Sequence, residues 1–200
     1  MPINIDEAGL VAILPEINEI KDPALRRGVI EIWLEIAAEC PWSRFEDIPK
    51  NTEAERARRL TDHVRGVTRT ALPMAETAKA HSGTEYDRDL LAAMCLLHDV
   101  SKPMECEPDP DGEPSGGPVM PARKSRMGKL IQHAVYATHK VFAHGLPLEV
   151  AHVVNTHTHQ SALRSVTVEG AYVFYADYAD SDAVIIPAGG RAFVGRWHLD

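Results

Sequence analysis

Histidine and aspartate residues fall on the apolar faces of the helices that this 200-residue sequence predicts. His63 shares a helical stripe with Leu60 and Val64, and Asp177 lies inside an apolar run of residues 172–178. Such side chains are costly to bury unless something pairs with them, and an unpaired carboxylate costs the most. A single histidine on an apolar face is more often a hydrogen-bonded core residue than a ligand, but several helices that each carry such a side chain together favour a shared polar centre.

The hydrophobic pattern is helical almost throughout. Expected helices cover residues 23–40, about 53–80 with Asn51 or Thr52 as cap, about 86–100, from about 125, about 148–157, and from about 167. Residues 41–51 are expected to form a loop, and residues 184–200 a short strand or an irregular tail. The pattern predicts an all-α fold, with a bundle of five core helices in residues 51–183 and an N-terminal helical extension in residues 1–50.

One long segment, residues 103–126, interrupts the helical pattern. Its first twenty residues hold six prolines, three glycines and five acidic residues, and its end holds the basic residues Arg123, Lys124 and Arg126. Loops of more than about 12–15 residues in compact domains are usually functional or disordered. We expect this insertion to cover the mouth of a pocket and select the substrate, with an external disordered loop as the alternative.

Composition excludes several classes of protein. The net charge of −8 offers no basic field for a nucleic acid. No apolar run reaches the roughly 18–20 residues that span a bilayer, and Asp6 and Glu7 stand where a signal peptide would be basic. Three cysteines without a CxxC motif suggest neither disulfides nor a zinc ribbon. We expect a cytoplasmic protein with a small-molecule substrate and no nucleic-acid or membrane partner.

An adjacent His98–Asp99 pair ends the apolar helix expected before residue 100. The pair could simply cap that helix, but aspartate has the wrong charge for the C-terminal end of a helix dipole. Imidazole and carboxylate groups together suit iron, manganese or zinc. His133 and His157 also lie on apolar helical faces, so several segments each bring a potential metal ligand to the interior.

The order H…HD…H…H…D, formed by His63, His98–Asp99, His133, His157 and Asp177, resembles the HD-domain metal-dependent phosphohydrolase superfamily. Three local features add to the resemblance, which covers about residues 55–183: the HDVSK sequence, the Gly-Leu-Pro turn after the third histidine, and the terminal Ala-Asp. The resemblance implies an HD-domain helical bundle.

The resemblance also implies roles for individual residues. The ligand set common to the superfamily would be His63, His98, Asp99 and Asp177. Its dinuclear members add two histidines, which match His133 and His157, and Asp99 would then bridge two divalent ions, iron or manganese. Lys102 matches a basic residue that faces the anionic group of the substrate, although a solvated lysine at a helix end is an alternative.

Some signatures of particular branches are absent. Residues 158–161 read Thr-His-Gln-Ser, where enzymes that hydrolyse cyclic dinucleotides carry Gly-Tyr-Pro, and the Glu-Asp pair of alarmone hydrolases is also missing. His159 could line the pocket, whereas His139, His144 and His152 are expected nearer the surface. Further anion contacts are conceivable at Arg65, Arg123, Lys124, Arg126 and Arg164.

The leading hypothesis is a metal-dependent hydrolase of a small phosphate ester or nucleotide, in which Asp99 and Lys102 act with a metal-activated water. One alternative is a di-iron oxygenase of the myo-inositol oxygenase or phosphonate oxygenase type, because that branch uses the same six positions. Another is a non-catalytic metal-binding protein. The amphipathic helix at residues 23–40, with Trp33, could serve a homodimer contact or the core.

Overall fold

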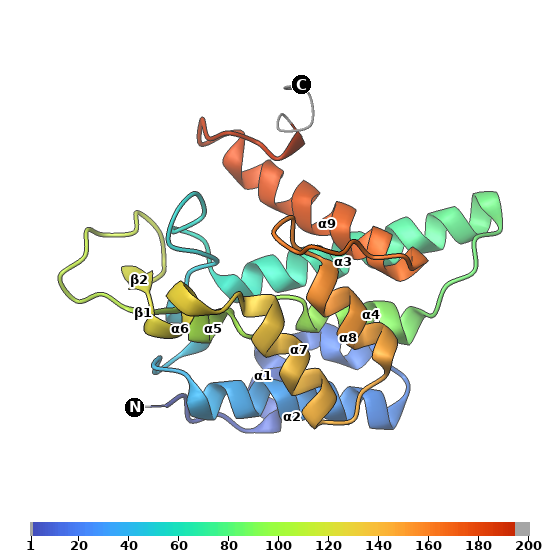
Figure 1. The fold of residues 1–200 in the computed structure, drawn as a ribbon, viewed down its shortest axis with the longest axis horizontal. Helices are drawn as coiled ribbons and strands as arrows, with labels where there is room; N and C mark the ends of the chain where they lie inside the picture. The colour runs from blue at the N-terminus through green and yellow to red at the C-terminus, as the bar shows by residue number, and fades with distance from the viewer. Residues whose placement is uncertain (1, 195–200) are drawn as a thin grey trace.

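The computed structural model describes residues 2–194 and confirms an all-α fold (Figure 1). The α-helices are α1 (Glu7–Ile13), α2 (Pro23–Glu39), α3 (Leu60–Ser82), α4 (Arg88–Leu97), α5 (Lys102–Glu105), α6 (Arg126–Leu130), α7 (His133–Ala143), α8 (Leu148–Thr156) and α9 (Val168–Ile185). Two 3₁₀ turns, η1 (Pro15–Glu19) and η2 (Phe45–Asp47), and two short antiparallel strands, β1 (Cys106–Pro108) and β2 (Ala122–Lys124), complete the described elements.

Helix α4 is the centre of the bundle. Every residue from Leu91 to Leu97 is buried, and the helix packs against α2, α3, α8 and α9. A helix that is apolar on all sides is typical of a buried position. Because α4 runs through the core, the His98–Asp99 pair at its C-terminal end is delivered to the interior of the molecule.

The other helices surround α4 in layers. Figure 1 shows α1 and α2 along one side, α3 and α9 along the opposite side, and α7 and α8 in front. Helix α9 packs along α3, and α7 packs on α8. The five helices that carry or immediately precede the predicted ligands are therefore in contact around one centre. Among residues 2–194, no helix is both long and apolar enough to cross a bilayer.

The N-terminal helices share the core of the bundle. The Trp33 indole donates a hydrogen bond to the Leu96 carbonyl oxygen at 3.0 Å, and the Trp42 indole donates to the carbonyl oxygens of Pro103 and Cys106. Buried side chains on both sides of residue 50 form one continuous cluster. The domain boundary at residue 50 stays a prediction. The homodimer also stays a prediction, but Trp33 is fully buried in the core and so does not support it.

The long helix expected from about residue 53 begins only at Leu60, so its predicted start was wrong. The Asn51 side chain accepts hydrogen bonds from the amides of Glu53 and Glu55, which makes a tight turn and not a helix cap. The Lys50 amide donates to the Arg58 carbonyl oxygen at 2.8 Å, which closes the turn into a loop. Residues 50–59 thus stay outside the helix and remain available for the site.

The helix expected from about residue 125 is also interrupted. Ile131 has an extended backbone conformation (φ −135°, ψ 130°), which separates α6 from α7. Leu130 is 72% exposed and Ile131 43% exposed, so both apolar side chains lie at the surface at this break. The break places His133 at the first position of α7. In the tail, residues 186–194 form turns and no strand, and the remainder of the predicted tail lies outside the described residues.

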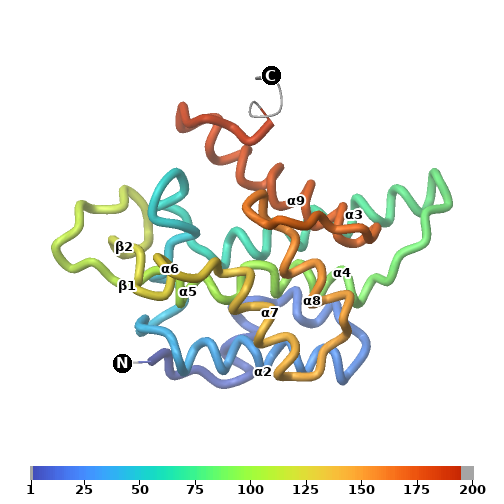
Figure 2. The backbone as a smooth tube through the Cα atoms, viewed as in Figure 1, coloured from blue at the N-terminus to red at the C-terminus, as the bar shows by residue number. Residues whose placement is uncertain are grey.

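The insertion at residues 103–126 packs against the loop that precedes α3, as Figure 2 shows. The Met120 amide donates to the Asp47 carbonyl oxygen at 3.0 Å. Gly117 lies so close to the Ala57 carbonyl oxygen that a Cβ atom there would collide with it. The insertion is therefore an ordered brace for residues 45–59, and the disordered alternative was wrong.

Candidate metal centre

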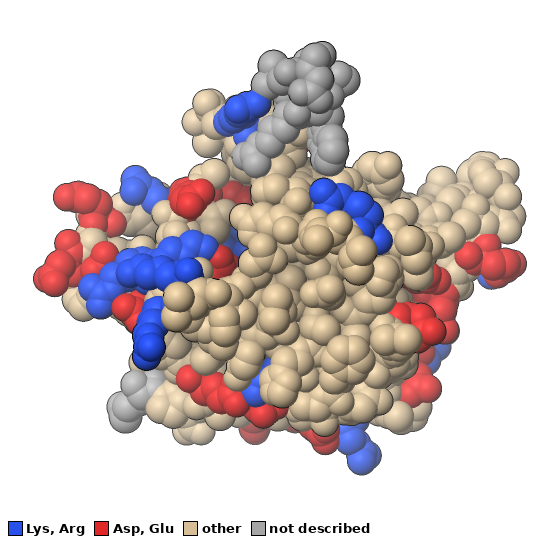
Figure 3. All heavy atoms as spheres, viewed as in Figure 1, with Lys and Arg blue, Asp and Glu red and all other residues tan. Residues whose placement is uncertain are grey.

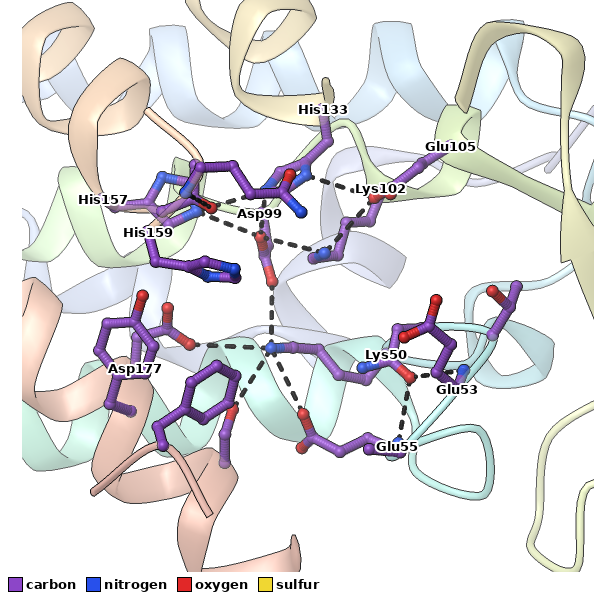
Figure 4. Close-up of a pocket in the computed structure, with 18 of the residues that line it drawn as sticks. Lys50, Glu53, Glu55, Asp99, Lys102, Glu105, His133, His157, His159 and Asp177 are labelled. Atoms are coloured by element: carbon purple, nitrogen blue, oxygen red, sulfur yellow. Dashed lines mark hydrogen bonds and ion pairs between the residues drawn. The ribbon is translucent and has the colours of Figure 1, made fainter. Parts of the chain in front are cut away.

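The six predicted ligand residues converge in the structure. They come from α3 (His63), the end of α4 (His98 and Asp99), the start of α7 (His133), the end of α8 (His157) and α9 (Asp177). Five of them are buried and His133 is half-buried. Figure 4 shows Asp99 in the middle of the labelled side chains.

The donor atoms form two groups. One consists of His63, His98 and Asp177, the other of Asp99, His133 and His157, and the donor atoms in each lie within 4.8 Å of one another. Asp99 Oδ2 lies 3.4 Å from His63 Nε2 and 3.6 Å from His98 Nε2. Asp99 Oδ1 lies 3.1 Å from His133 Nε2 and 3.5 Å from His157 Nε2. The two oxygens of one carboxylate thus face two different groups.

Backbone carbonyls fix the tautomers of two histidines. His98 Nδ1 lies 2.6 Å from the Cys95 carbonyl oxygen, and His157 Nδ1 lies 2.7 Å from the Val154 carbonyl oxygen. A carbonyl oxygen only accepts, so each Nδ1 is the protonated nitrogen. Burial lowers the pKa of His98 to about 3, which keeps this ring neutral. The Nε2 lone pairs of both rings therefore face the centre.

Carboxylates orient the other two rings. His63 Nδ1 lies 2.7 Å from Asp180 Oδ2, and Asp180 is itself paired with Arg58. His133 Nδ1 lies 3.3 Å from Glu105 Oε2. Carboxylates behind ligating histidines set ring orientation and strengthen the ring as a donor. All four histidines consequently present Nε2 to the centre.

The geometry fits bound cations. The Nε2 atoms of His63 and His98 lie 3.2 Å apart, and those of His133 and His157 lie 3.3 Å apart. Two nitrogens held about 2.1 Å from one ion at tetrahedral or octahedral angles would be about 3.0–3.4 Å apart. In addition, the buried Asp99 Oδ2 has no hydrogen-bond partner within residues 2–194. The close approach of histidine nitrogens in pairs and a buried carboxylate oxygen without a hydrogen bond are both consistent with a bound cation.

The electrostatics of His63 support the same conclusion. Burial and the nearby Lys50 lower its pKa, but the carboxylates of Asp177, Asp180 and Asp99 outweigh them and raise the pKa to about 9. The three carboxylates therefore favour positive charge at this point, which a divalent cation would supply.

Lys50 is a component of the site that sequence reasoning missed. Its buried ammonium lies 3.7 Å from Asp99 Oδ2, from Asp177 Oδ1 and from Glu55 Oε2, and 3.4 Å from Ser181 Oγ. Figure 4 shows the side chain reaching in from the loop before α3. The loop has no hydrophobic periodicity, so the sequence offered no signal for this placement.

Lys102 is buried at the other side of Asp99. Its ammonium lies 3.8 Å from Asp99 Oδ1 and 3.4 Å from Glu105 Oε2. Burial lowers the pKa of Lys102, but the charges of Asp99 and Glu105 raise it above its ordinary value, so the ammonium stays charged. The alternative of a solvated lysine was wrong for Lys102.

A cavity of about 270 Å³ opens over this centre. Its lining includes Lys50, Lys102 and Lys124 as well as His159, which was expected as a possible lining residue. The other proposed anion contacts lie elsewhere: Arg65 pairs with Glu16, Arg123 with Glu107 and Arg164 with backbone carbonyl oxygens, and Arg126 is exposed. Of the histidines expected nearer the surface, His144 pairs with Glu35, His152 accepts a hydrogen bond from the Val166 amide, and His139 is exposed. Figure 3 shows lysine and arginine gathered around the strands and α6.

An all-α bundle that gathers four histidines and two aspartates in this order is an HD domain. The family model of the HD domain matches residues 60–182, and the chain belongs to this family. It is 30% identical over 172 residues to a dihydroneopterin 2′,3′-cyclic phosphate phosphodiesterase of Methanocaldococcus jannaschii. The match covers 82% of this chain and 66% of that relative, so the chain spans just under two thirds of the relative's length. No solved structure matches the chain.

Proposed function

We propose that this protein is a metal-dependent phosphohydrolase that cleaves a small phosphodiester at a dinuclear centre. His63, His98 and Asp177 would hold one divalent ion, and His133 and His157 the other. Asp99 would bridge them. The observation that carries the proposal is that the two carboxylate oxygens of Asp99 face different groups: Oδ2 faces the first group and Oδ1 faces the second. Imidazole and carboxylate donors suit iron or manganese.

The substrate class follows from the pocket and from the relative. The cavity of about 270 Å³ suits a small molecule. Its lining holds three lysines beside five carboxylates, so bound divalent ions would be needed to make the site positive for a phosphate. The relative from Methanocaldococcus jannaschii is a phosphodiesterase that acts on a 2′,3′-cyclic phosphate. We therefore place small phosphate esters and nucleotides in the substrate class, with five-membered cyclic phosphodiesters first among them.

Two lysines flank Asp99 and would hold the reacting phosphoryl group. Lys50 lies beside Oδ2 and Lys102 beside Oδ1, so ammonium groups approach the phosphoryl site from both sides. Positive groups fixed in a buried site offset the charge that develops on phosphoryl oxygens in the transition state. Bound divalent ions would lower the pKa of a coordinated water and polarise the phosphoryl group. Glu105 contacts both the His133 ring and Lys102, which ties the two together.

Metal quantitation on protein purified without added metal tests this proposal, followed by a panel of cyclic and linear phosphoesters. We expect two equivalents of iron or manganese and phosphoester cleavage that Asp99→Ala abolishes. Cleavage that survives Asp99→Ala would refute the proposal. A mixed-valent iron signal with oxygen uptake on a phosphonate or polyol would replace it with the oxygenase, and bound metal without any turnover would replace it with a binding protein.

A further inference from the structure

The walls of the cavity differ in chemistry. The lining includes Lys50, Lys102 and Lys124, and it also includes Ile185 and the rings of His159, Tyr178 and Phe193. Figure 4 shows His159 and Lys102 on opposite sides of Asp99 in that view. A pocket with a cationic part and an aromatic part fits a ligand that has an anionic group and a planar apolar body.

The aromatic side chains form a continuous wall. The Tyr178 ring centroid lies 4.4 Å from that of Phe174 and 4.5 Å from that of Phe193. Phe193 in turn lies 6.0 Å from the His159 ring. Tyr178 directly follows Asp177, so the wall starts next to the candidate metal centre. It extends from α9 through the tail to the segment after α8.

A buried carboxylate holds the tail in this wall. Asp182 Oδ1 accepts a hydrogen bond from the Phe193 amide at 2.6 Å, and Asp182 Oδ2 accepts one from the Val194 amide at 2.9 Å. Hydrogen bonds to an ionised acceptor are stronger than those between neutral groups. Both oxygens of Asp182 are thus used to position the backbone of Phe193. Phe193 lies outside residues 60–182, so it belongs to this chain and not to the matched HD segment.

We propose that the wall formed by His159, Tyr178 and Phe193 is a binding slot for a planar aromatic ring of the substrate. Phe193 is its specificity-determining residue, and Asp182 is a positioning residue that acts through Phe193. The inference rests on the proposed function and narrows it to phosphodiesters that carry an aromatic ring. With the phosphate held near the lysines, the ring contacts the wall, because aromatic side chains bind planar rings by stacking and edge contacts.

The test compares substrates that share one reacting group. The 2′,3′-cyclic phosphates of adenosine and guanosine and glycerol 1,2-cyclic phosphate all contain the same five-membered cyclic diester, but only the two nucleotides carry a planar aromatic base. We expect the native protein to favour a ring-bearing substrate in kcat/KM by about tenfold or more, chiefly through KM. Phe193→Ala should lower that ratio about tenfold, whereas Phe193→Trp should keep it. Phe142→Ala is the matched control, because Phe142 is 55% exposed on α7 and does not line the cavity.

The role of Asp182 is tested by the same ratio. Asp182→Ala should lower the preference for the ring as Phe193→Ala does, and the double variant should show no further loss. A retained preference in Asp182→Ala would remove the positioning role, and a thermal melt shows whether that variant folds. Phe193 is in the tail, so its variants test the slot even when Asp182→Ala unfolds.

Failure of the slot and failure of the proposed function give different results. Equal kcat/KM for all three cyclic phosphates would overturn the slot while supporting the phosphodiesterase. If none is cleaved, calorimetry with adenosine 2′-monophosphate, guanosine 2′-monophosphate and glycerol 2-phosphate still decides the slot. Tighter binding of either nucleotide that weakens in Phe193→Ala supports it, and equal affinities overturn it.

Discussion

The ammonium of Lys50 lies 3.7 Å from Oδ2 of Asp99, although Lys50 belongs to a loop that precedes the matched HD segment. The loop is closed by the hydrogen bond between the Lys50 amide and the Arg58 carbonyl oxygen, and Gly117 of the insertion packs against it at Ala57. A flexible side chain thus starts from a fixed backbone. The N-terminal part of the chain contributes a cation that the HD segment itself does not contain.

Replacing Lys50 should reduce catalysis without removing metal. We expect Lys50→Ala to lower kcat/KM about 100-fold, because a fixed charge near the transition state is lost. Lys50→Arg should recover part of the loss. Steady-state kinetics and metal analysis on the same samples measure both effects. Lys79→Ala is a matched control, because Lys79 is exposed on α3 and pairs with Glu85. If Lys50→Ala loses its metal, Lys50 is a structural residue of the centre.

Removing the carboxylate behind His63 should weaken metal binding. Asp180→Ala deletes the carboxylate that lies 2.7 Å from His63 Nδ1. Loss of such a partner typically lowers metal affinity about 10- to 100-fold. Competition with a chromophoric chelator gives the affinity. Asp62→Asn on the exposed face of α3 is the control, since Asp62 points away from the centre and pairs with the neighbouring Arg59 at 3.9 Å. Unchanged affinity in Asp180→Ala would contradict an orienting role.

Metal removal should destabilise the protein. A ligand present at 1,000 times its Kd adds about 4 kcal/mol to the free energy of unfolding. For a chain of this size, about 4 kcal/mol corresponds to a fall in Tm of about 10 °C. Calorimetry before and after chelation, and after iron or manganese is restored, measures the change. Asp99→Ala should show no response to metal, and a native protein with the same Tm in all three states would argue against the centre.

An ion cluster away from the metal centre should give an acid-side dependence of stability. Hydrogen bonds from His144 and Lys140 lower the pKa of Glu35 below 4.5. A lowered pKa means that the contribution is present above the unfolded value of 4.5 and is lost as the pH falls through the folded value. Because Glu35 is partly exposed, we expect a contribution of only about 0.5 kcal/mol.

Glu35→Gln isolates this contribution. The difference in Tm between native and variant proteins should shrink from about pH 5 to about pH 3, because protonation removes the same charge that the variant lacks. Subtraction of the two curves cancels the protonation of groups near the metal centre. A difference that stays constant across this range would show that Glu35 is not titrating there.

The helical periodicity of the sequence predicted the bundle, and the resemblance to the HD-domain superfamily identified the six converging residues. His63 and Asp177 stand on apolar helical faces, where an unpaired polar group is costly, and that cost is visible without a structure. The outer partner of His63 also had a signal, although it was overlooked. Asp180 follows Asp177 by three positions, and residues at that spacing share one face of a helix.

The remaining parts depend on contacts between segments far apart in the chain. Lys50 reaches the centre from a loop without periodicity, and Asn51 closes a turn where its residue type equally suits a helix cap. The break at Ile131 follows from an extended backbone conformation inside a pattern that reads as helical. Phe193 lines the cavity from an irregular tail, where its amide donates a hydrogen bond to the Asp182 carboxylate. Cytoplasmic location remains a prediction from composition.

The residues that line the cavity are spread along the sequence from Lys50 to Phe193. Lys50 is translated before the helices α3 to α9, whereas Asp177 lies on α9 and Phe193 follows it. A nascent chain on the ribosome therefore holds the second group, Asp99, His133 and His157, before α9 supplies Asp177 to the first. If the proposed centre forms, its first group should accordingly load its ion only after α9 has emerged.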